Sequence, residues 1–253
     1  PYAACGLIWR RFGKDVVRFN DTSLSEEDVN SVFRYIDRNL IECIDAIDNG
    51  IRSTATIIPT PDVSSLISNF NPPWDADNAA EDSYFQEAVK LADIVLGNAL
   101  AQQISTVKAK KFISEAYEKR PRPELLVLDR SYPWARVLNS IDRNREVLYV
   151  VFPREDEYLI QTVRGNSSMG NRKSLPEEWA GKREEELNKV LGIDDAIFCH
   201  SGRFIAGAKS IESVMKMADM AIEAPEKKPP KKFGHVLKKF IAKQLKSIGR
   251  QHP

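Results

Sequence analysis

The sequence predicts an α/β protein in which a largely helical first part precedes an α+β second part. Two observations predict this class. Apolar residues recur at helical spacing through most of residues 1–120, and after residue 120 short apolar runs typical of strands alternate with shorter helical patterns. The chain has 253 residues, of which 42% are hydrophobic, so it is long enough for one large domain or two ordinary ones.

The first part is organised around an apolar helical stripe that ends within residues 40–51. The stripe follows a serine-rich, acidic helix start at 23–28, and Asn49 and Gly50 supply the stop. Near its end, isoleucines at every third position predict a buried face: Ile41, Ile44 and Ile47.

Three further helices are predicted in the first part. The earliest covers Tyr2 to Phe12, a short one covers Asp62 to Phe70, and the longest covers about Glu81 to Tyr117. At about 1.5 Å per residue, the longest would extend for about 50 Å. The earliest helix has an apolar face formed by Cys5, Ile8, Trp9 and Phe12.

The second part is predicted as two pairs of strands, separated by one helix and closed by another. A short apolar run at 125–128 precedes them. The closing helix is expected to turn Ile211, Val214, Met215 and Ala218 inward. The predicted elements are strands at 147–152 and 158–163, a helix at 182–191, strands at 196–200 and 204–206, and the closing helix at 210–223.

Residues 225–253 form a basic tail that differs from the rest of the chain. This tail holds nine Lys or Arg residues against the single acid Glu226, and its second half has the pattern of an amphipathic helix. Two interpretations remain open. The tail binds a polyanion such as nucleic acid or a lipid surface, or it docks on the acidic body of its own chain or of a second copy in a homo-oligomer. The predicted domains are therefore 1–120, 121–224 and 225–253.

The three cysteines, Cys5, Cys43 and Cys199, are scattered and odd in number, which favours a reducing, cytoplasmic compartment over a disulfide framework. No apolar run approaches the 18 or more residues of a membrane span, so no transmembrane segment is expected. The sequence opens with Pro1 and Tyr2 and has no initiator methionine, which suggests a processed or tagged protein or an internal piece of a longer one.

Asp45 and Asp48 are the first candidates for chemistry. They lie three positions apart, so they share one flank of the helix that ends near Gly50. Carboxylates at the C-terminal end of a helix face the negative end of its dipole, and something positive must compensate. A divalent cation would do so, and the alternative is two solvated acids.

A second candidate stretch is residues 200–210, where a strand ends and glycines bracket a turn before Lys209 leads into a helix. Backbone N–H groups at the helix start, with His200 and Arg203 nearby, would suit a phosphate. Arg172 and Lys173 add positive charge on another loop. The alternative is an ordinary hairpin whose glycines serve turns.

Several motifs together resemble the Myg-type exonuclease family, named for a melanocyte proliferating gene and a branch of the DHH phosphoesterases. The resemblance covers about residues 1–222, and residues 2–13 are similar to the family's helix that comes after an Asp-His-His motif. The motifs that carry it are residues 44–51, Asn-Pro-Pro-Trp at 71–74, residues 171–181, Ile-Phe-Cys-His at 197–200 and Phe-Ile-Ala-Gly at 204–207.

The resemblance implies a two-lobed, metal-dependent phosphoesterase, with 3′–5′ exoribonuclease or oligonucleotide-hydrolase activity. It implies two Mn²⁺ ions, with Mg²⁺ as the alternative, and RNA or a short oligonucleotide as substrate. Asp48 matches the family's last metal-binding and catalytic aspartate, and Asp45 is its neighbour. The phosphate-binding side would comprise His200, Arg203, Gly207 and Lys209, with Arg172 and Lys173.

The sequence also departs from the family pattern. Ala206 stands where many relatives have the first of two glycines, Arg203 replaces a small residue, and the front segment with the Asp-His-His motif has no counterpart. Asp45 and Asp48 alone cannot hold two metal ions. We therefore expect this chain to be part of a longer enzyme and inactive by itself. The alternative is a non-catalytic module that binds nucleic acid through the tail and the phosphate loop.

Overall fold

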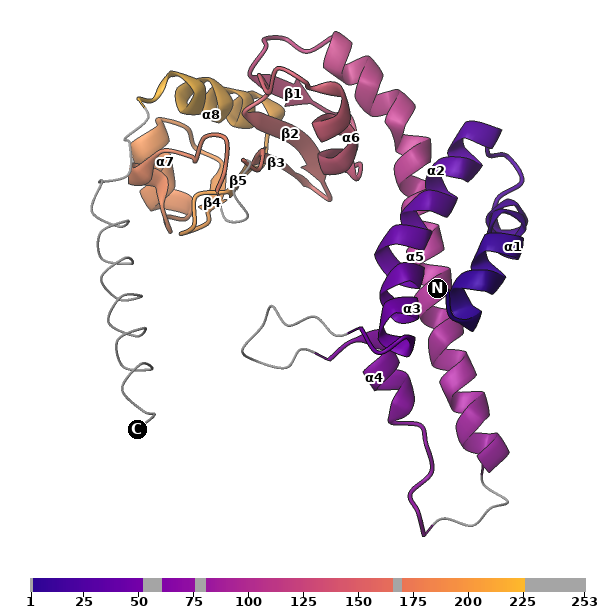
Figure 1. Cartoon of the computed structure of the whole chain (residues 1–253). Coiled ribbons are helices and arrows are strands. Elements are labelled where there is room, and N and C mark those ends of the chain that lie inside the picture. The colour runs from indigo at the N-terminus through magenta and orange to yellow at the C-terminus, as the bar shows by residue number, and fades with distance from the viewer. Residues whose placement is uncertain (1, 52–60, 76–80, 166–169, 226–253) are drawn as a thin grey trace, which may run out of the picture. The chain divides into compact units, whose positions relative to one another are not determined.

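A computed structural model of the chain describes residues 2–51, 61–75, 81–165 and 170–225 (Figure 1). The chain divides into two compact units, Pro1–Glu146 and Val147–Pro253. Helices and strands are both present, which confirms the predicted α/β class. The predicted tail lies outside the described residues except for Pro225.

The first unit is mostly helical, as predicted. The long helix α5 (Glu81–Glu118) confirms the predicted span to within one residue at its end, and it packs against both α2 and α6. The remaining elements of this unit are α1 (Ala4–Asn20), α2 (Glu26–Ile36), the π-helical turn η1 (Asp37–Ile41), α3 (Glu42–Asp48), α4 (Val63–Ser68), β1 (Leu125–Val127) and α6 (Trp134–Ile141).

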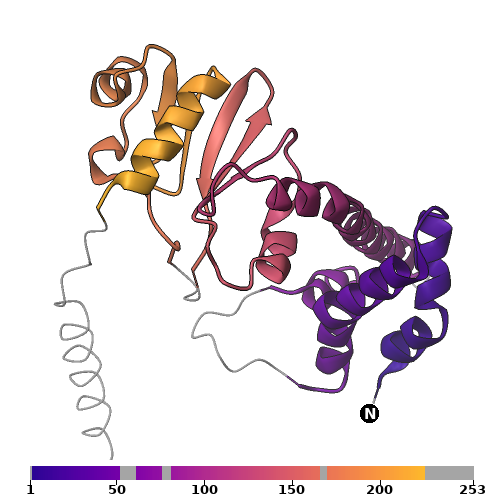
Figure 2. The same ribbon diagram turned by 90° about the horizontal axis from the view of Figure 1, so that it is seen from above.

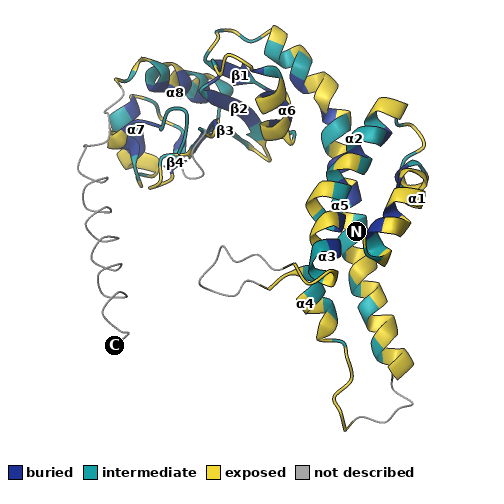
Figure 3. Ribbon diagram, viewed as in Figure 1, coloured by how far each residue is buried: buried dark blue, intermediate teal, exposed yellow. Residues whose placement is uncertain are grey.

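The core of the first unit lies where α1 and α2 meet the middle of α5. Trp9 stacks on Phe33 with ring centroids 5.6 Å apart, and this pair joins α1 to α2. The early part of α5 has no buried side chain before Leu100, and Figure 3 shows the exposed positions along it. The fully packed members of this core are Trp9, Val17, Val29, Val32, Ile36, Ile41, Leu100 and Ile104.

Helix α1 differs from its prediction in length and in its buried face. It continues to Asn20, well beyond Phe12. Trp9 is buried as predicted, but Ile8 and Phe12 are 61% and 53% exposed. The face was wrongly predicted because α1 buries a narrower stripe that includes two glycines, Gly6 and Gly13.

The helix that ends near Gly50 is not continuous, because the π-helical turn η1 separates α2 from α3. A π-helical turn inserts an extra residue and rotates all later residues of the helix about its axis. Ile41 is buried as predicted, whereas Ile44 and Ile47 are only partly buried. The fully buried side chain of α3 is instead that of Asp45.

In its described residues, the second unit contains four strands in the order β2, β3, β5, β4, and neighbouring strands are antiparallel. The predicted hairpins are confirmed: β2 pairs with β3, and β4 pairs with β5. Pairing between β3 and β5 joins the two hairpins, with Leu159 opposite Gly207. The elements are β2 (Tyr149–Arg154), β3 (Glu157–Thr162), η3 (Glu177–Trp179), α7 (Glu184–Leu191), β4 (Ala196–Cys199), β5 (Ile205–Ala208) and α8 (Ile211–Glu223).

Helix α8 packs against β2, β3 and β5, and Figure 2 shows it in yellow along one face of these strands. Its buried side chains recur at the spacing of a helical face: Val214, Met217, Ala218 and Ala221. Val214 and Ala218 were predicted to face inward. Ile211 and Met215 were predicted to do so too, but they are only partly buried because the buried stripe runs through Met217.

Among the helices in the described ranges, none has both the length and the apolar character that crossing a membrane would require.

Candidate functional site

The carboxylate of Asp45 is buried against the start of α1. Asp45 is only 6% exposed, and its Oδ1 accepts a hydrogen bond from the backbone N–H of Gly6 at 2.9 Å. Gly6 is the third residue of α1, so its N–H is one of those that a helix leaves without an internal partner. The positive end of the α1 dipole therefore faces Asp45 and supplies the compensation that its helix position requires.

Gly6 is required by this close contact. A Cβ atom at position 6 would lie 2.7 Å from Oδ1 of Asp45 and 2.9 Å from a ring carbon of Tyr2. Both distances are shorter than real Cβ contacts, so a larger residue would push α1 away from α3. The sequence carried no direct signal for Gly6, since the partner is 39 positions away.

Asp48 is the last residue of α3 and is exposed. The chain then leaves the helix through Asn49, whose N–H donates to the Asp45 carbonyl at 3.1 Å, and through Gly50 in the left-handed region at φ 77°. This confirms the predicted helix stop. Asp48 is thus held on an ordered turn and faces no described side-chain partner that would neutralise it in an ion pair.

Several acids lie near the start of α1. Burial raises the pKa of the Cys5 thiol, and the charges of Asp45 and Asp48 raise it further. Burial, with the charges of Glu42 and Asp45, also raises the pKa of Asp37, while the nearby cation Arg10 acts in the opposite direction.

These acids do not by themselves form a two-metal site. Within residues 2–51, 61–75, 81–165 and 170–225, no group of three or more His, Cys, Asp or Glu side chains is placed to hold a metal ion. A site with two ions needs several ligands for each of them. Any such site at Asp48 would need ligands from outside the described ranges.

The second candidate region begins at the turn between β4 and β5. The side chain of His200 is exposed, its Nδ1 accepts the N–H of Gly202 at 2.9 Å, and its ring lies 4.4 Å from that of Phe204. Arg203 adopts a left-handed conformation at φ 55°, and its Nη1 donates to the carbonyl of Leu175 at 3.4 Å. His200 and Arg203 therefore lie in one tight turn.

Gly207 lies inside β5, where neighbouring residues of the sheet leave no room for a side chain. A Cβ atom there would lie 2.8 Å from a methyl carbon of Leu159 and 3.3 Å from the ring of Phe198. The residue is also buried, so its backbone is covered by neighbouring side chains.

Lys209 is exposed and precedes the N-terminus of α8, as predicted. A carboxylate already lies at this helix start, because Asp195 accepts the N–H of Ser210 at 2.8 Å. The side chain of Ser210 caps the helix by accepting the N–H of Ser213. Both groups use positions that the sequence suggested for a phosphate.

Arg172 and Lys173 both bind backbone carbonyls. Arg172 donates to the carbonyl of Val147 at 2.8 Å. Lys173 donates to the carbonyls of Ile222 and Ala224, each at 2.7 Å, and so caps the C-terminal end of α8. Because α8 has 13 residues, Lys173 and Lys209 mark its opposite ends, about 20 Å apart. The structure does not bring these two lysines together.

Comparison with known proteins places the chain in a family. A family model named for the MYG1 exonuclease, and described as an uncharacterised protein family (UPF0160), matches residues 1–222. The chain belongs to this MYG1 family. The resemblance found in the sequence motifs is thereby confirmed.

Curated members of the MYG1 family come from distant eukaryotes. A MYG1 protein of Schizosaccharomyces pombe is 26% identical over 241 residues, covering 88% of this chain and 74% of the relative. A MYG1 protein of Saccharomyces cerevisiae is 28% identical, covering 87% and 72%. The human relative, called MYG1 exonuclease, is 28% identical, covering 85% and 62%. No solved structure matches the chain.

Proposed function

We propose that this chain is part of a metal-dependent phosphodiesterase that removes nucleotides from RNA or short oligonucleotides in the 3′–5′ direction. Mn²⁺ is the proposed ion, with Mg²⁺ as the alternative, and the proposed compartment is the cytoplasm. Membership of the MYG1 family supports the proposal, as do the mammalian relatives named exonuclease. The proposed arrangement is the two-lobed one of the DHH phosphoesterases, with lobes at 1–120 and 121–224.

One observation carries the proposal: the hydrogen bond from Gly6 to Asp45. It places the first turn of α1 against the end of α3, where Asp48 is exposed. In the family that the chain resembles, this first helix comes after the Asp-His-His motif. The same packing would bring such a motif beside Asp48, whose exposed carboxylate would be available to a cation.

The proposed roles of the two aspartates differ. Asp48 is exposed and is proposed to bind the metal, whereas Asp45 is engaged with α1 and is proposed to position that helix. Because the described residues lack a complete ligand set, we propose that they do not catalyse by themselves and that the intact protein does.

On the substrate side, His200, Arg203 and Lys209 are proposed to contact phosphate, and Gly207 to keep β5 close to β3. His200 and Lys209 are exposed, which leaves them accessible to a ligand. Lys173 and Arg172 are proposed to act indirectly, by fixing α8 and the loop before η3 through the bonds to backbone carbonyls.

The test is Mn²⁺-dependent hydrolysis of a 5′-labelled single-stranded RNA by the intact protein. Asp48→Asn should reduce the rate at least a hundredfold because it removes a charged ligand without changing shape. Glu118→Gln, an exposed acid on α5, is the matched control and should retain the wild-type rate.

Equal rates for wild type and Asp48→Asn would overturn the assignment of Asp48. If the intact protein hydrolyses no nucleic acid with any divalent ion but binds it, and if deletion of 225–253 abolishes that binding, the alternative of a binding module holds.

A further inference from the structure

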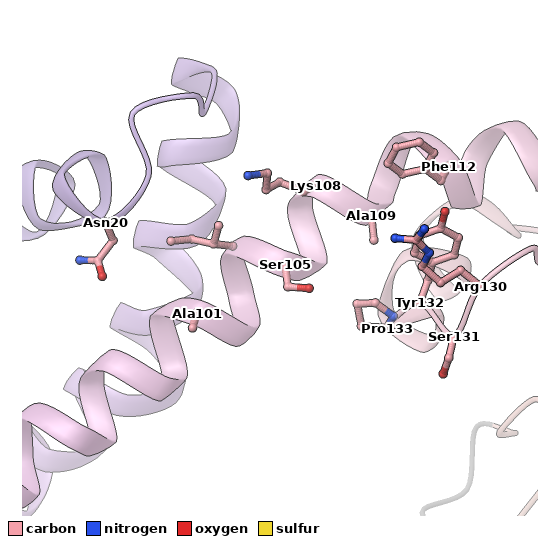
Figure 4. Close-up of a pocket in the computed structure, with 11 residues that line it drawn as sticks. Asn20, Ala101, Ser105, Lys108, Ala109, Phe112, Arg130, Ser131, Tyr132 and Pro133 are labelled. Carbon is pink, nitrogen blue, oxygen red and sulfur yellow. The ribbon is translucent and has the colours of Figure 1, made fainter. Parts of the chain in front are cut away.

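A pocket of about 520 Å³ lies within the first unit, away from Asp45 and Asp48 in the sequence. It is formed by the C-terminal end of α1, the middle of α5 and residues 130–133 before α6. Its volume falls in the range of small-molecule sites. Figure 4 shows the side chains that line it, with an aromatic end at Phe112 and Tyr132.

The aromatic end is a stacked pair. The rings of Phe112 and Tyr132 are nearly parallel, at 4°, with centroids 5.5 Å apart. Phe112 is nevertheless 50% exposed, so much of its surface is not covered by Tyr132. A rigid, exposed aromatic surface at the edge of a pocket is the platform on which a flat ring can stack.

Cationic side chains flank the same pocket. Arg130 is exposed and forms no ion pair with the residues that the structure describes. Lys108 is also exposed, and its ammonium is held by Asp21 at 2.7 Å. Figure 4 shows Arg130 at the aromatic end and Lys108 farther along α5, between Phe112 and Asn20.

Other polar side chains that line the pocket can form hydrogen bonds with a sugar. Ser105 and Ser131 line the pocket with hydroxyl groups, and Asn20 adds a side-chain amide. Ile104 and Ala109 are buried and contribute an apolar floor. The pocket therefore combines an aromatic platform, hydroxyl groups and an exposed guanidinium.

We propose that this pocket binds one nucleotide unit of single-stranded nucleic acid, at a position separate from the proposed catalytic site. The base stacks on Phe112 beside Tyr132, and Arg130 binds the adjoining phosphate. Aromatic stacking combined with cationic phosphate contacts is the general mode by which proteins hold single strands. The inference rests on the proposed function for the class of ligand, and it gives that function a second, anchoring contact with the substrate.

The experiment measures binding of an eight-nucleotide single-stranded RNA that contains 2-aminopurine to the intact protein, in EDTA. Phe112→Leu keeps an apolar side chain but removes the ring, so binding should weaken about 5-fold or more and the quenching of 2-aminopurine should fall. Arg130→Gln should weaken binding and reduce the slope of log K against log salt by about 0.7. Phe112→Trp should retain both binding and quenching.

The control is Phe85→Leu, which changes another exposed aromatic residue of α5, outside the pocket, and should leave binding unchanged. Equal affinity and quenching in wild type, Phe112→Leu and Arg130→Gln would overturn the inference, as would absence of binding. EDTA prevents hydrolysis, so the result does not depend on whether Asp48 binds a metal. Conversely, hydrolysis that depends on Asp48 but not on Phe112 would overturn the inference that the pocket binds a nucleotide and would leave the proposed function intact.

Discussion

The role of Asp45 depends on the group that its carboxylate contacts. In the sequence, Asp45 lies near the C-terminal end of its helix, where its charge faces the negative end of the helix dipole. A bound cation was one way to compensate that charge. The structure supplies a different partner, the N–H of Gly6 at the positive end of α1. The spacing of the two aspartates was informative about their shared flank but could not separate their environments, since one is buried and the other is exposed.

Because Gly6 contacts Asp45, replacing this helical glycine with alanine is expected to destabilise the protein. Alanine normally stabilises a helix interior relative to glycine, yet Gly6→Ala should lower the free energy of unfolding by about 1–3 kcal/mol because the new Cβ overlaps Asp45. Urea denaturation followed by circular dichroism measures this change.

Gly97 of α5 is the matched control, since a Cβ there would meet nothing within 4 Å. Gly97→Ala should raise the free energy of unfolding by about 0.4–1 kcal/mol. A stabilised Gly6→Ala variant would contradict the close packing of α1 on α3.

The ion pair between Asp21 and Lys108 predicts a dependence of stability on pH. Hydrogen bonds from Lys108 and Ser23 lower the pKa of Asp21 to about 2. A carboxyl with a lowered pKa stabilises the folded state above its unfolded pKa of about 3.9, and this contribution is lost as the pH falls towards 2. Asp21→Asn should therefore be less stable than wild type at pH 6, and the difference should disappear near pH 2.

Denaturation midpoints of both proteins across pH 2–7 test this dependence. A difference that stays constant down to pH 2 would show that Asp21 acts through shape and not through its charge.

At the scale of the helix and strand, the sequence was most informative where a pattern repeats. The apolar periodicity of α5 located it within one residue at its end, and the strand runs located both hairpins. It was least informative at η1, because a π-helical turn has no pattern of its own and changes only the phase of the helix after it. The short helix α6 was missed, although α4 and α7, which are no longer than α6, were both predicted.

The two lysines at the ends of α8 are expected to contribute differently to the free energy of unfolding. Lys173 donates to two carbonyls at its C-terminal end, and Lys173→Met should lower the free energy of unfolding by about 1–2 kcal/mol. Lys209→Met, at the opposite exposed end, should change it by less than about 0.5 kcal/mol.

Thermal or urea denaturation of the two variants under identical conditions provides the comparison. If Lys209→Met proves the more destabilising of the two, the capping role of Lys173 is wrong.

At the scale of the whole molecule, the family was accessible from sequence because its motifs are contiguous, and the match over residues 1–222 confirms it. The pocket at Phe112 and Tyr132 was not accessible, because its parts come from segments as distant as Asn20 and Pro133 and neither carries a motif. The prediction of a phosphate-binding side was limited in the same way, because residues that are close in sequence need not act together in the fold. Sequence proximity grouped Arg172 with Lys173, and folding assigned each to a different backbone partner.

The proposed hydrolysis requires that Asp48 bind a divalent cation in the intact protein. Titration of Mn²⁺ followed by electron paramagnetic resonance measures this directly, because bound and free ions give different signals. We predict that Asp48→Asn weakens Mn²⁺ binding at least tenfold while Glu118→Gln binds like wild type. Identical Mn²⁺ affinities for wild type and Asp48→Asn would contradict the claim.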